Sequence, residues 1–280
     1  MIKNNILNSS ENLIYTRIKR DPFFNMPEAH YHPYHELYYL ISGSRKFFID
    51  HRIYNVNKGD LIVIPKEHIH RTTYMSNMTH ERIVIEYHDH LLLPLYQNYD
   101  TEMLSDILMP NQISIPLNRR TYMEDLFSKI EREYLSLDEF SSLLLQNYMT
   151  ELLTFLIRCQ KRTNTPSQHL SATDTLIENA AQYIFHNYEK VLTLDSVAAK
   201  YNMSPSHFSK KFKTITGFGF KEYLNSIRIK KAEKLLLETN LSITEIALQC
   251  GYNDSNYFGD AFKKEKGVSP KKYRSGKGYV

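Results

Sequence analysis

The chain has 280 residues, a hydrophobic content of 42%, and 35 Lys and Arg against 31 Asp and Glu, which gives a formal net charge of +4. This length allows two domains with separate cores. No apolar run approaches the ~18 residues of a membrane span, and residues 1–10 lack the apolar segment of a signal peptide, so we expect a soluble cytoplasmic protein without membrane contact. The two cysteines, Cys159 and Cys250, lie far apart in helical patterns, which argues against a disulfide framework and fits a reducing compartment.

Short runs of β-branched and aromatic residues, separated by turn signals, fill the segment from Tyr15 to about Tyr87. Several short strands at such spacing predict a barrel or a double-sheet jelly roll. The clearest runs cover residues 36–41, 46–49, 60–64 and 82–86.

The side chains of the first clear run are expected to alternate between two faces. If Glu36 faces the interior, Tyr38 and Leu40 face it too, whereas Leu37 and Tyr39 pack outward. The interior of the barrel therefore receives a carboxylate and a phenol.

Two motifs in this region carry a resemblance to a known fold. They are His30-x-His32-x3-Glu36-x6-Gly43 and Gly59-x5-Pro65-x4-His70. They resemble the two motifs of the cupin barrels, although Glu67 stands where cupins often have Gly and the later Asn is missing. The resemblance covers roughly residues 15–90 and implies a cupin-type barrel.

Three roles are open for the polar residues of these motifs. In metal-binding cupins the matching residues are ligands, and three imidazoles with one carboxylate suit Zn, Mn, Fe or Ni. Sensor cupins instead use the same positions to hydrogen-bond an organic effector, and the histidines could also be merely solvated. We expect an effector pocket without a cofactor, a divalent metal being the open alternative, whereas His35 and His68 are expected at the surface. The ligand-binding candidates are His30, His32, Glu36, Tyr38 and His70, and all of them except Tyr38 are also metal-ligand candidates.

Two amphipathic helical stripes follow the barrel, over residues 121–137 and 138–159. A Ser-Leu-Asp turn separates them, so we expect an antiparallel pair that either caps the barrel or forms a homodimer interface. The apolar positions of the stripes are Met123, Leu126, Phe127, Ile130, Tyr134, Leu137, Phe140, Leu143, Leu144, Tyr148, Leu152, Phe155 and Leu156.

The charge is divided unevenly along the chain. Residues 171–280 hold 17 Lys and Arg against 11 Asp and Glu, and residues 1–170 hold 18 against 20, which together give the totals of 35 and 31. The net +6 of the second half suits a phosphate-binding surface. The predicted domains are a sensor barrel (1–117), the helical pair (118–160), a polar, Pro-containing linker (161–171) and an all-α domain (172–280) that opens with a helix at 173–189.

The all-α domain contains the same helix-turn-helix unit twice, over about 193–216 and 242–266. Ser242 and Glu245 form a capping box, and Thr193 takes the place of Ser242 in the first copy. Ser204 and Asp254 are N-cap residues of the two second helices. The pairs 50 residues apart are Phe208 and Phe258, Phe212 and Phe262, Lys213 and Lys263, Gly217 and Gly267, and Tyr223 and Tyr273.

The segment Gly251 to Arg274 follows the signature of the AraC/XylS family of transcription regulators, and the resemblance covers about one hundred residues. It implies two DNA-reading helices held about one DNA turn apart by a rigid helix at 221–237. Family members often carry a cupin-type effector sensor and dimerise through helices next to it. The resemblance therefore implies double-stranded DNA, a small-molecule effector, a second copy of the chain and, for an activator, RNA polymerase as partners.

The candidate DNA-binding residues lie on the outer faces of the two second helices. Many family members have Ser and Arg where this chain has Gly259 and Asp260, so we expect more base readout from the first copy and more phosphate contact from the second. The candidates are Ser206, His207, Ser209, Lys210, Lys213, Ser255, Asn256, Tyr257, Gly259, Asp260 and Lys263.

The sequence therefore predicts an α+β multidomain protein that acts as a sequence-specific transcriptional regulator, an activator as in most family members. Its cupin domain is expected to sense a small polar metabolite such as a carbohydrate. The alternative from a different class is a metal-dependent cupin enzyme with an appended DNA-binding domain, for which Glu67 is the only spare base. A third alternative is an architectural DNA-binding protein with a closed pocket. We expect no enzymatic activity.

Overall fold

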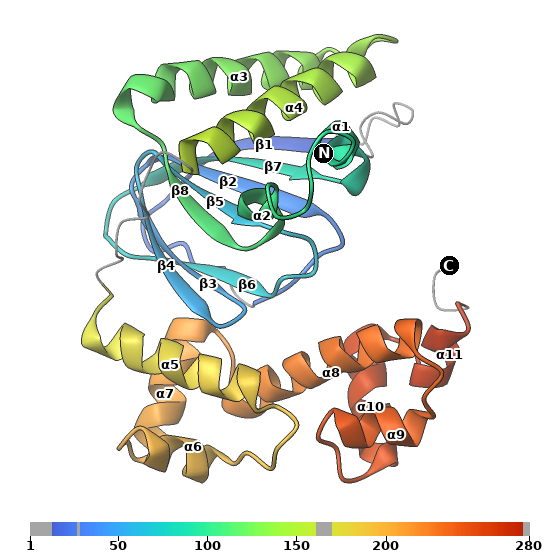
Figure 1. The fold of residues 1–280 in the computed structure, drawn as a ribbon. Helices are drawn as coiled ribbons and strands as arrows, with labels where there is room; N and C mark the ends of the chain where they lie inside the picture. Colours follow the sequence, from blue (N-terminus) through green and yellow to red (C-terminus); the bar gives the residue numbers. More distant parts are fainter. Residues whose placement is uncertain (1–12, 27–28, 161–169, 277–280) are drawn as a thin grey trace. The chain divides into compact units, whose positions relative to one another are not determined.

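The computed structural model describes residues 13–26, 29–160 and 170–276. The chain divides into two compact units, Met1–His169 and Leu170–Val280, and each is described by itself. The strands of the first unit (Figure 1) are β1 (Leu13–Arg20), β2 (His35–Ser42), β3 (Ser44–Ile49), β4 (Arg52–Asn57), β5 (Asp60–Ile64), β6 (His70–Tyr74), β7 (His80–Tyr87) and β8 (Asn111–Ser114).

Two antiparallel sheets form the first unit. The larger has the order β1-β7-β2-β5-β8 and the smaller the order β4-β3-β6. The four runs predicted as strands are β2, β3, β5 and β7. Of the two predicted forms the double-sheet jelly roll is the correct one, since the two sheets face each other and do not close into a barrel.

The predicted alternation along β2 is confirmed, because it separates two cores. Tyr38 and Leu40 pack between the sheets with Phe47 of β3. Leu37 and Tyr39 pack on the other face of the larger sheet, in a core that also contains residues of the helical pair. The outward face of β2 is therefore buried as well, under helices rather than in solvent.

The helical pair covers this outer face of the larger sheet (Figure 1). The helices of the first unit are η1 (Asp89–Leu92), α1 (Leu93–Tyr96), α2 (Ser105–Leu108), α3 (Leu117–Leu135) and α4 (Ser141–Gln160). The stripe predicted for α3 is buried at its first four positions, Met123, Leu126, Phe127 and Ile130.

The beginning of the stripe predicted for α4 is wrong. Phe140, Leu143 and Leu144 are exposed by 64%, 65% and 37%, and Leu145 and Met149 are buried instead. The helix begins at Ser141, so Phe140 lies before it, and Ser141, Leu145, Met149 and Leu152 form the buried stripe at helical spacing. An apolar surface therefore stays uncovered at the start of α4.

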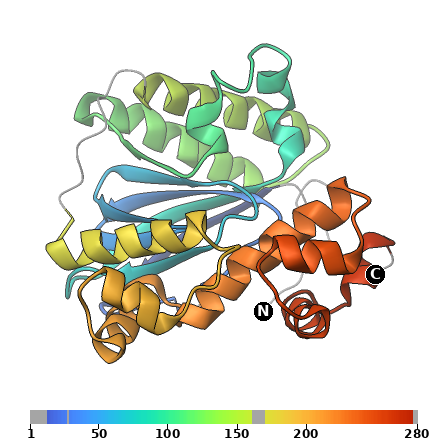
Figure 2. The same ribbon diagram turned by 60° about the horizontal axis from the view of Figure 1, so that its bottom comes forward.

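The second unit is built around α8 (Figures 1 and 2). α5, α6 and α7 lie at one end of this long helix, and α9, α10 and α11 lie at the other. Of the predicted linker, residues 161–169 lie outside the described residues, whereas Ser171 caps α5. The helices are α5 (Ala172–His186), α6 (Leu194–Lys200), α7 (Pro205–Thr216), α8 (Phe220–Glu238), α9 (Ile243–Gln249), α10 (Ser255–Lys266) and α11 (Pro270–Arg274).

Candidate functional site

A cluster of three histidines lies at one end of the space between the two sheets. His30 forms an isolated antiparallel bridge with His70 through two backbone hydrogen bonds of 3.1 and 2.9 Å. His32 follows two residues later, and the rings of His32 and His70 lie 4.9 Å apart. Glu36 reaches the cluster from β2, with Oε2 3.2 Å from Nε2 of His32 and 3.8 Å from Nε2 of His70. The structure thus brings together four of the five predicted ligand-binding residues.

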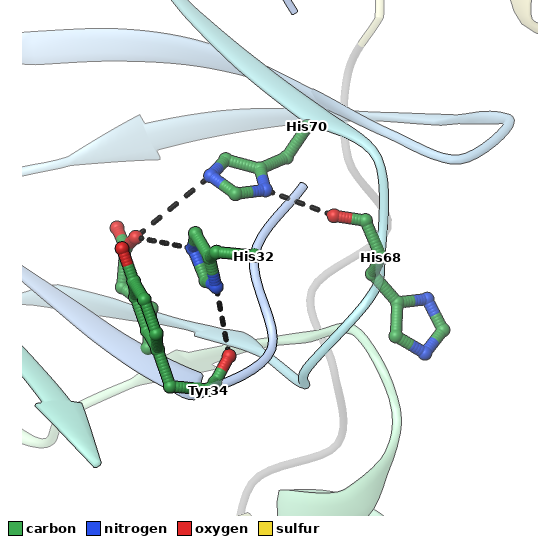
Figure 3. Close-up of polar contacts among 5 residues, drawn as sticks. His32, Tyr34, His68 and His70 are labelled. Carbon is green, nitrogen blue, oxygen red and sulfur yellow. Dashed lines mark hydrogen bonds and ion pairs between the residues drawn. The ribbon is translucent and has the colours of Figure 1, made fainter. Parts of the chain in front are cut away.

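Backbone carbonyls orient two of these rings (Figure 3). Nδ1 of His32 lies 2.8 Å from the oxygen of Tyr34, and Nδ1 of His70 lies 2.9 Å from the oxygen of His68. A ring that donates through Nδ1 presents Nε2 to the opposite side. Both Nε2 atoms are therefore directed towards Glu36.

Burial and the Glu36 carboxylate set the charge of the cluster. Burial lowers the pKa of His70 to about 4, so His70 is neutral at pH 7. Burial also acts to lower the pKa of His32, but the hydrogen bond and the charge of Glu36 outweigh it and the pKa is raised. Burial acts to raise the pKa of Glu36, yet His32, His70 and Arg82 together hold it below its usual value. The cluster is thus a buried carboxylate with imidazoles on two sides.

The donor set fits a divalent metal ion. One nitrogen from each of His30, His32 and His70 lies within 4.8 Å of the others. Ligand atoms about 2.1 Å from a tetrahedral ion lie roughly 3.4 Å from one another, which the spacings around Glu36 of 3.2 and 3.8 Å approach. Nε2 of His70 is buried and has no hydrogen-bond partner among the described residues. These residues would hold the ion through imidazole nitrogen and carboxylate oxygen.

The fifth predicted residue, Tyr38, lies farther into the sandwich. It lines a cavity of about 90 Å³ together with Glu36, Thr72, Arg82 and Glu86, among others. The sequence reasoning missed Arg82 and Glu86, although both share the parity of the interior residue Val84 on β7. The alternation of side chains along β7 could therefore have identified both residues as interior.

The prediction that His35 and His68 lie at the surface is wrong for His35. His35 is 4% exposed, its ring stacks on Tyr87, and its Nε2 lies 2.9 Å from Oδ1 of Asp89. It faces away from the cluster as expected, but that face of the sheet is covered. The ring of His68 points away from His32 and His70 (Figure 3), and it is half-buried beside Asp50.

The caps predicted for the two helix-turn-helix units are present. Ser242 and Glu245 form the capping box, and in the first unit Thr193 forms one with Ser196, which had not been predicted. Ser204 accepts from the amide of His207, and Asp254 accepts from the amides of Asn256 and Tyr257. Gly217 and Gly267 end α7 and α10 in the left-handed region, with φ of 89° and 76°. The same local rules thus build both units.

The candidate DNA-binding residues lie where a duplex could reach them. In α7 all five are exposed or half-buried beside the buried Phe208 and Phe212. Four of the five share one surface hollow with Leu194 of α6, and these four are Ser206, Ser209, Lys210 and Lys213. In α10 all six are likewise exposed or half-buried, and the Cβ position of Gly259 has no atom within 4 Å. Their contacts with bases or phosphates stay a prediction.

A contact between the two helix-turn-helix halves of the C-terminal domain was not predicted from the sequence. Arg228 of α8 donates from Nε to the oxygen of Tyr188 (2.8 Å) and from Nη2 to the oxygen of Lys190 (2.9 Å), in the loop after α5. A Cβ at Gly251, in the turn before α10, would lie 2.8 Å from the oxygens of Tyr188 and Glu189. We call Arg228, Gly251 and residues 188–190 the clamp. It joins the turn of the second helix-turn-helix unit to the first half of the C-terminal domain.

Among the described residues, no helix has the length and apolarity needed to cross a membrane.

Both halves of the chain match known families. The AraC-like ligand binding domain matches residues 13–153, and a helix-turn-helix domain matches residues 197–276. The chain is similar to the HTH-type transcriptional activator RhaR of Salmonella schwarzengrund, with 27% identity over 257 residues that cover 88% of this chain and 86% of the relative.

Two further similarities concern parts of the chain. The uncharacterized HTH-type transcriptional regulator YijO of Escherichia coli is 36% identical over 121 residues, 43% of each chain. The solved C-terminal domain of AraT, a response regulator from Geobacillus stearothermophilus, is 43% identical, covers 39% of this chain and 88% of that chain, and gives a TM-score of 0.36.

Proposed function

This chain belongs to the AraC family of transcriptional regulators, and on that premise we propose that it reads a specific DNA site with α7 and α10 while a small molecule between its two sheets controls transcription. The observation that supports the proposal is the pair of equivalent helix-turn-helix units, which we call the two readers, joined by the long helix α8. Both readers have capped second helices, and both expose polar faces beside buried phenylalanines. Such helices enter the major groove with their first turns.

The two readers suit consecutive major grooves on one side of the duplex, about one turn or roughly 34 Å apart. Ser206, Lys210 and Asn256 are proposed to contact base edges, and Lys213 and Lys263 to contact phosphates. The remaining candidates on the two faces support these contacts. Affinity should therefore fall with increasing salt, because bound phosphates release counterions.

The effector is proposed to be a small polar metabolite, of which a carbohydrate is one class. The polar groups of His30, His32, Glu36, Tyr38 and His70 between the sheets support this assignment. The relative from Salmonella is named as a transcriptional activator, and we propose activation here too, with RNA polymerase as a partner. An effector that prefers one arrangement of the chain shifts DNA binding by its difference in affinity.

A homodimer is proposed to form through the uncovered side chains at the ends of the helical pair. Leu117 and Leu135 of α3 are exposed by 78% and 75%, and Phe140 and Leu143 by 64% and 65%. Pairing through these side chains would double the number of readers on the DNA. Analytical ultracentrifugation of the Phe140→Ser, Leu143→Ser variant tests it, since an unchanged dimer would contradict this interface.

The histidine cluster supports a divalent metal as a second occupant of the pocket. The ion would supply a Lewis acid that holds an oxygen of the effector. Metal analysis of the purified chain, with His32→Ala as the comparison, tests this. A chain that purifies without metal and binds none of Zn, Mn, Fe or Ni excludes the assignment, whereas metal-dependent turnover of a substrate would favour the cupin enzyme.

Selection of bound sequences from random DNA by the full-length chain tests the main proposal. We expect one recurrent site with two elements, which Lys210→Ala binds more weakly and His32→Ala still recognises. If no sequence is enriched over the starting pool, sequence-specific regulation is contradicted. If a site is enriched, a map of bound chromosomal sites would identify the controlled genes.

A further inference from the structure

Three arginines and a histidine lie together at the end of the sandwich away from the histidine cluster. Arg45 of β3 is 1% exposed, and Arg20 of β1 and Arg82 of β7 are half-buried with buried Nε atoms. His80 at the start of β7 is 2% exposed. All four face the space between the sheets, because they share the parity of interior residues on their strands.

The described groups that hold Arg45 are neutral. It donates from Nη1 to the oxygen of Phe24 (2.7 Å) and from Nε to Oγ1 of Thr72 (3.2 Å). Its Nη2 is buried and makes no well-formed hydrogen bond among the described residues, although the Tyr38 hydroxyl lies nearby. Among the described residues no carboxylate forms an ion pair with it. Burial lowers the pKa of Arg45 to about 10, and the charge of Arg82 acts in the same direction.

The charges of the three arginines act on the neighbouring His80. Burial, together with the charges of Arg45, Arg82 and Arg20, lowers the pKa of His80 to about 4. The guanidinium groups of Arg20 and Arg82 lie over the rings of Phe24 and Tyr38, at 4.8 and 5.3 Å. An aromatic face offsets only a part of the cost of a buried cation. A buried charge without a partner is expensive to keep, so a position that served packing alone would favour an apolar residue.

The cavity of about 90 Å³ lies beside this group, and two unsatisfied polar atoms belong to residues that line it. Tyr38 is 1% exposed and its hydroxyl lies beside the guanidinium groups of Arg82 and Arg45, but among the described residues neither this hydroxyl nor Nε of Arg82 makes a well-formed hydrogen bond. Glu36 and Glu86 line the cavity too. A ligand here would meet hydrogen-bond donors at one end and carboxylate acceptors at the other.

We propose that the cavity binds a small hydroxylated organic anion, whose acidic group is held by Arg82 and the Tyr38 hydroxyl in front of Arg45 and whose hydroxyl groups donate to Glu36 and Glu86. The inference rests on the proposed effector pocket and narrows its ligand from a neutral polar metabolite to an acid. Arginine and a phenol suit carboxylate or phosphate oxygens. The volume is far below the ~300 Å³ of a pocket for a drug-sized ligand, so only a few heavy atoms fit without rearrangement.

Ligands of similar shape but different charge test whether the cavity requires an anion. Glycerate and glycerol differ only in a carboxylate for a hydroxymethyl group, and glycerol 3-phosphate supplies the phosphate arm. Calorimetric titration of the full chain, at constant ionic strength and with a chelator present, is expected to show binding of glycerate or glycerol 3-phosphate and none of glycerol. Equal binding of all three, or binding of none, would overturn the proposal.

Three variants locate the site. Arg82→Met and Tyr38→Phe should each weaken the binding of the anion about tenfold or more, because each removes a hydrogen bond to a charged group. Arg52→Met, which removes an exposed arginine on β4, is the control and should bind normally. Unchanged affinity in Arg82→Met would exclude the site.

Arg45→Met distinguishes a ligand site from a structural arginine. If Arg45 serves the anion, the variant without ligand should melt at the same temperature as the wild type or higher, since an unpaired buried charge has been removed, and the stabilisation by the anion should disappear. A lower melting temperature together with undiminished anion binding would assign Arg45 to structure and reject the proposal. DNA selection by the same variant stays normal in either case, so failure here is distinct from failure of the regulator assignment.

Discussion

The two helix-turn-helix units have helices of the same lengths but present different chemistry to DNA, and the second has one extra residue before the N-cap of its second helix. Their turns match, since Asn202 and Gly251 both have positive φ, 54° and 83°, and Met203 and Tyr252 donate to equivalent alanine carbonyls. The outer faces differ, because Lys210 of α7 stands where α10 has Asp260. Caps and glycines are thus kept in both copies, where folding requires them, and the exposed positions are free to differ. Four changes test how far the equivalence goes.

The turn residues should be the least interchangeable. Gly251→Asn, which installs the residue of the first unit, is expected to lower the free energy of unfolding by about 2–3 kcal/mol, because its Cβ meets the carbonyl oxygens of Tyr188 and Glu189. Asn tolerates positive φ, so backbone strain contributes little. Asn202→Gly is the matched control and should cost under about 1 kcal/mol. Urea unfolding of the full chain followed by circular dichroism measures both, and equal losses would remove the proposed asymmetry.

The lysine of the first reader should matter more for sequence recognition than any single residue of the second. Lys210→Ala is expected to weaken binding to the selected site by about 1–3 kcal/mol, or roughly ten- to a hundredfold, and to relax the preference at one base pair. Lys263→Ala should weaken binding to all sequences alike. Fluorescence anisotropy with the selected site and with single-base variants measures this, and an equal, sequence-independent loss in both variants would contradict the assignment of base readout to α7.

The two N-caps should differ in strength. Asp254 accepts two amide hydrogen bonds, from Asn256 at 2.6 Å and Tyr257 at 3.1 Å, whereas Ser204 accepts one at 3.4 Å. Asp254→Ala should therefore cost about 1–2 kcal/mol of unfolding free energy and Ser204→Ala roughly 0.5–1 kcal/mol, since a carboxylate also interacts with the helix dipole. Thermal unfolding provides the comparison, and a larger loss in Ser204→Ala would reverse it.

The smallest effect is expected at Asp260. Its exposed carboxylate would lie near the negative DNA backbone, so Asp260→Asn should strengthen binding by about two- to fivefold at low salt, with the gain shrinking as salt rises. Glu265→Gln, on the same helix, gives the comparison for simple loss of an exposed acid. Weaker binding of Asp260→Asn to one particular sequence would instead indicate that the carboxylate accepts a hydrogen bond from cytosine.

Local patterns predicted much of this molecule because many of its elements are defined locally. Caps and αL glycines depend on neighbours within a few residues, and the strands β2, β5 and β7 are apolar enough to recognise. β1, β4, β6 and β8 were not singled out, since charged or polar residues interrupt their apolar residues. The buried face of α4 was misassigned at its start, because Leu143, Leu144 and Leu145 are consecutive apolar residues and only the fold selects Leu145 for the core.

The candidate site was predictable only in part. The spacing of His30, His32, Glu36 and His70 indicated that they would meet, and they do. Arg45 and Arg82 were missed because a charged residue in a strand is ordinarily assigned to solvent, whereas here the strand parity places both inside. The clamp could not be seen in the sequence at all, since it depends on backbone carbonyls that only the tertiary fold brings to Arg228.

The clamp has a consequence for operator architecture. Because Arg228 and Gly251 fasten the second reader to the carbonyls of residues 188–190, the domain cannot twist one reader against the other without breaking those contacts. Five extra base pairs between the two elements of a site would rotate the second groove by about half a turn, onto the far side of the helix. On such a promoter only one helix-turn-helix unit should contact its element, because the domain does not deform to reach the other. The spacing of the two elements, and not only their sequence, therefore decides whether the gene responds.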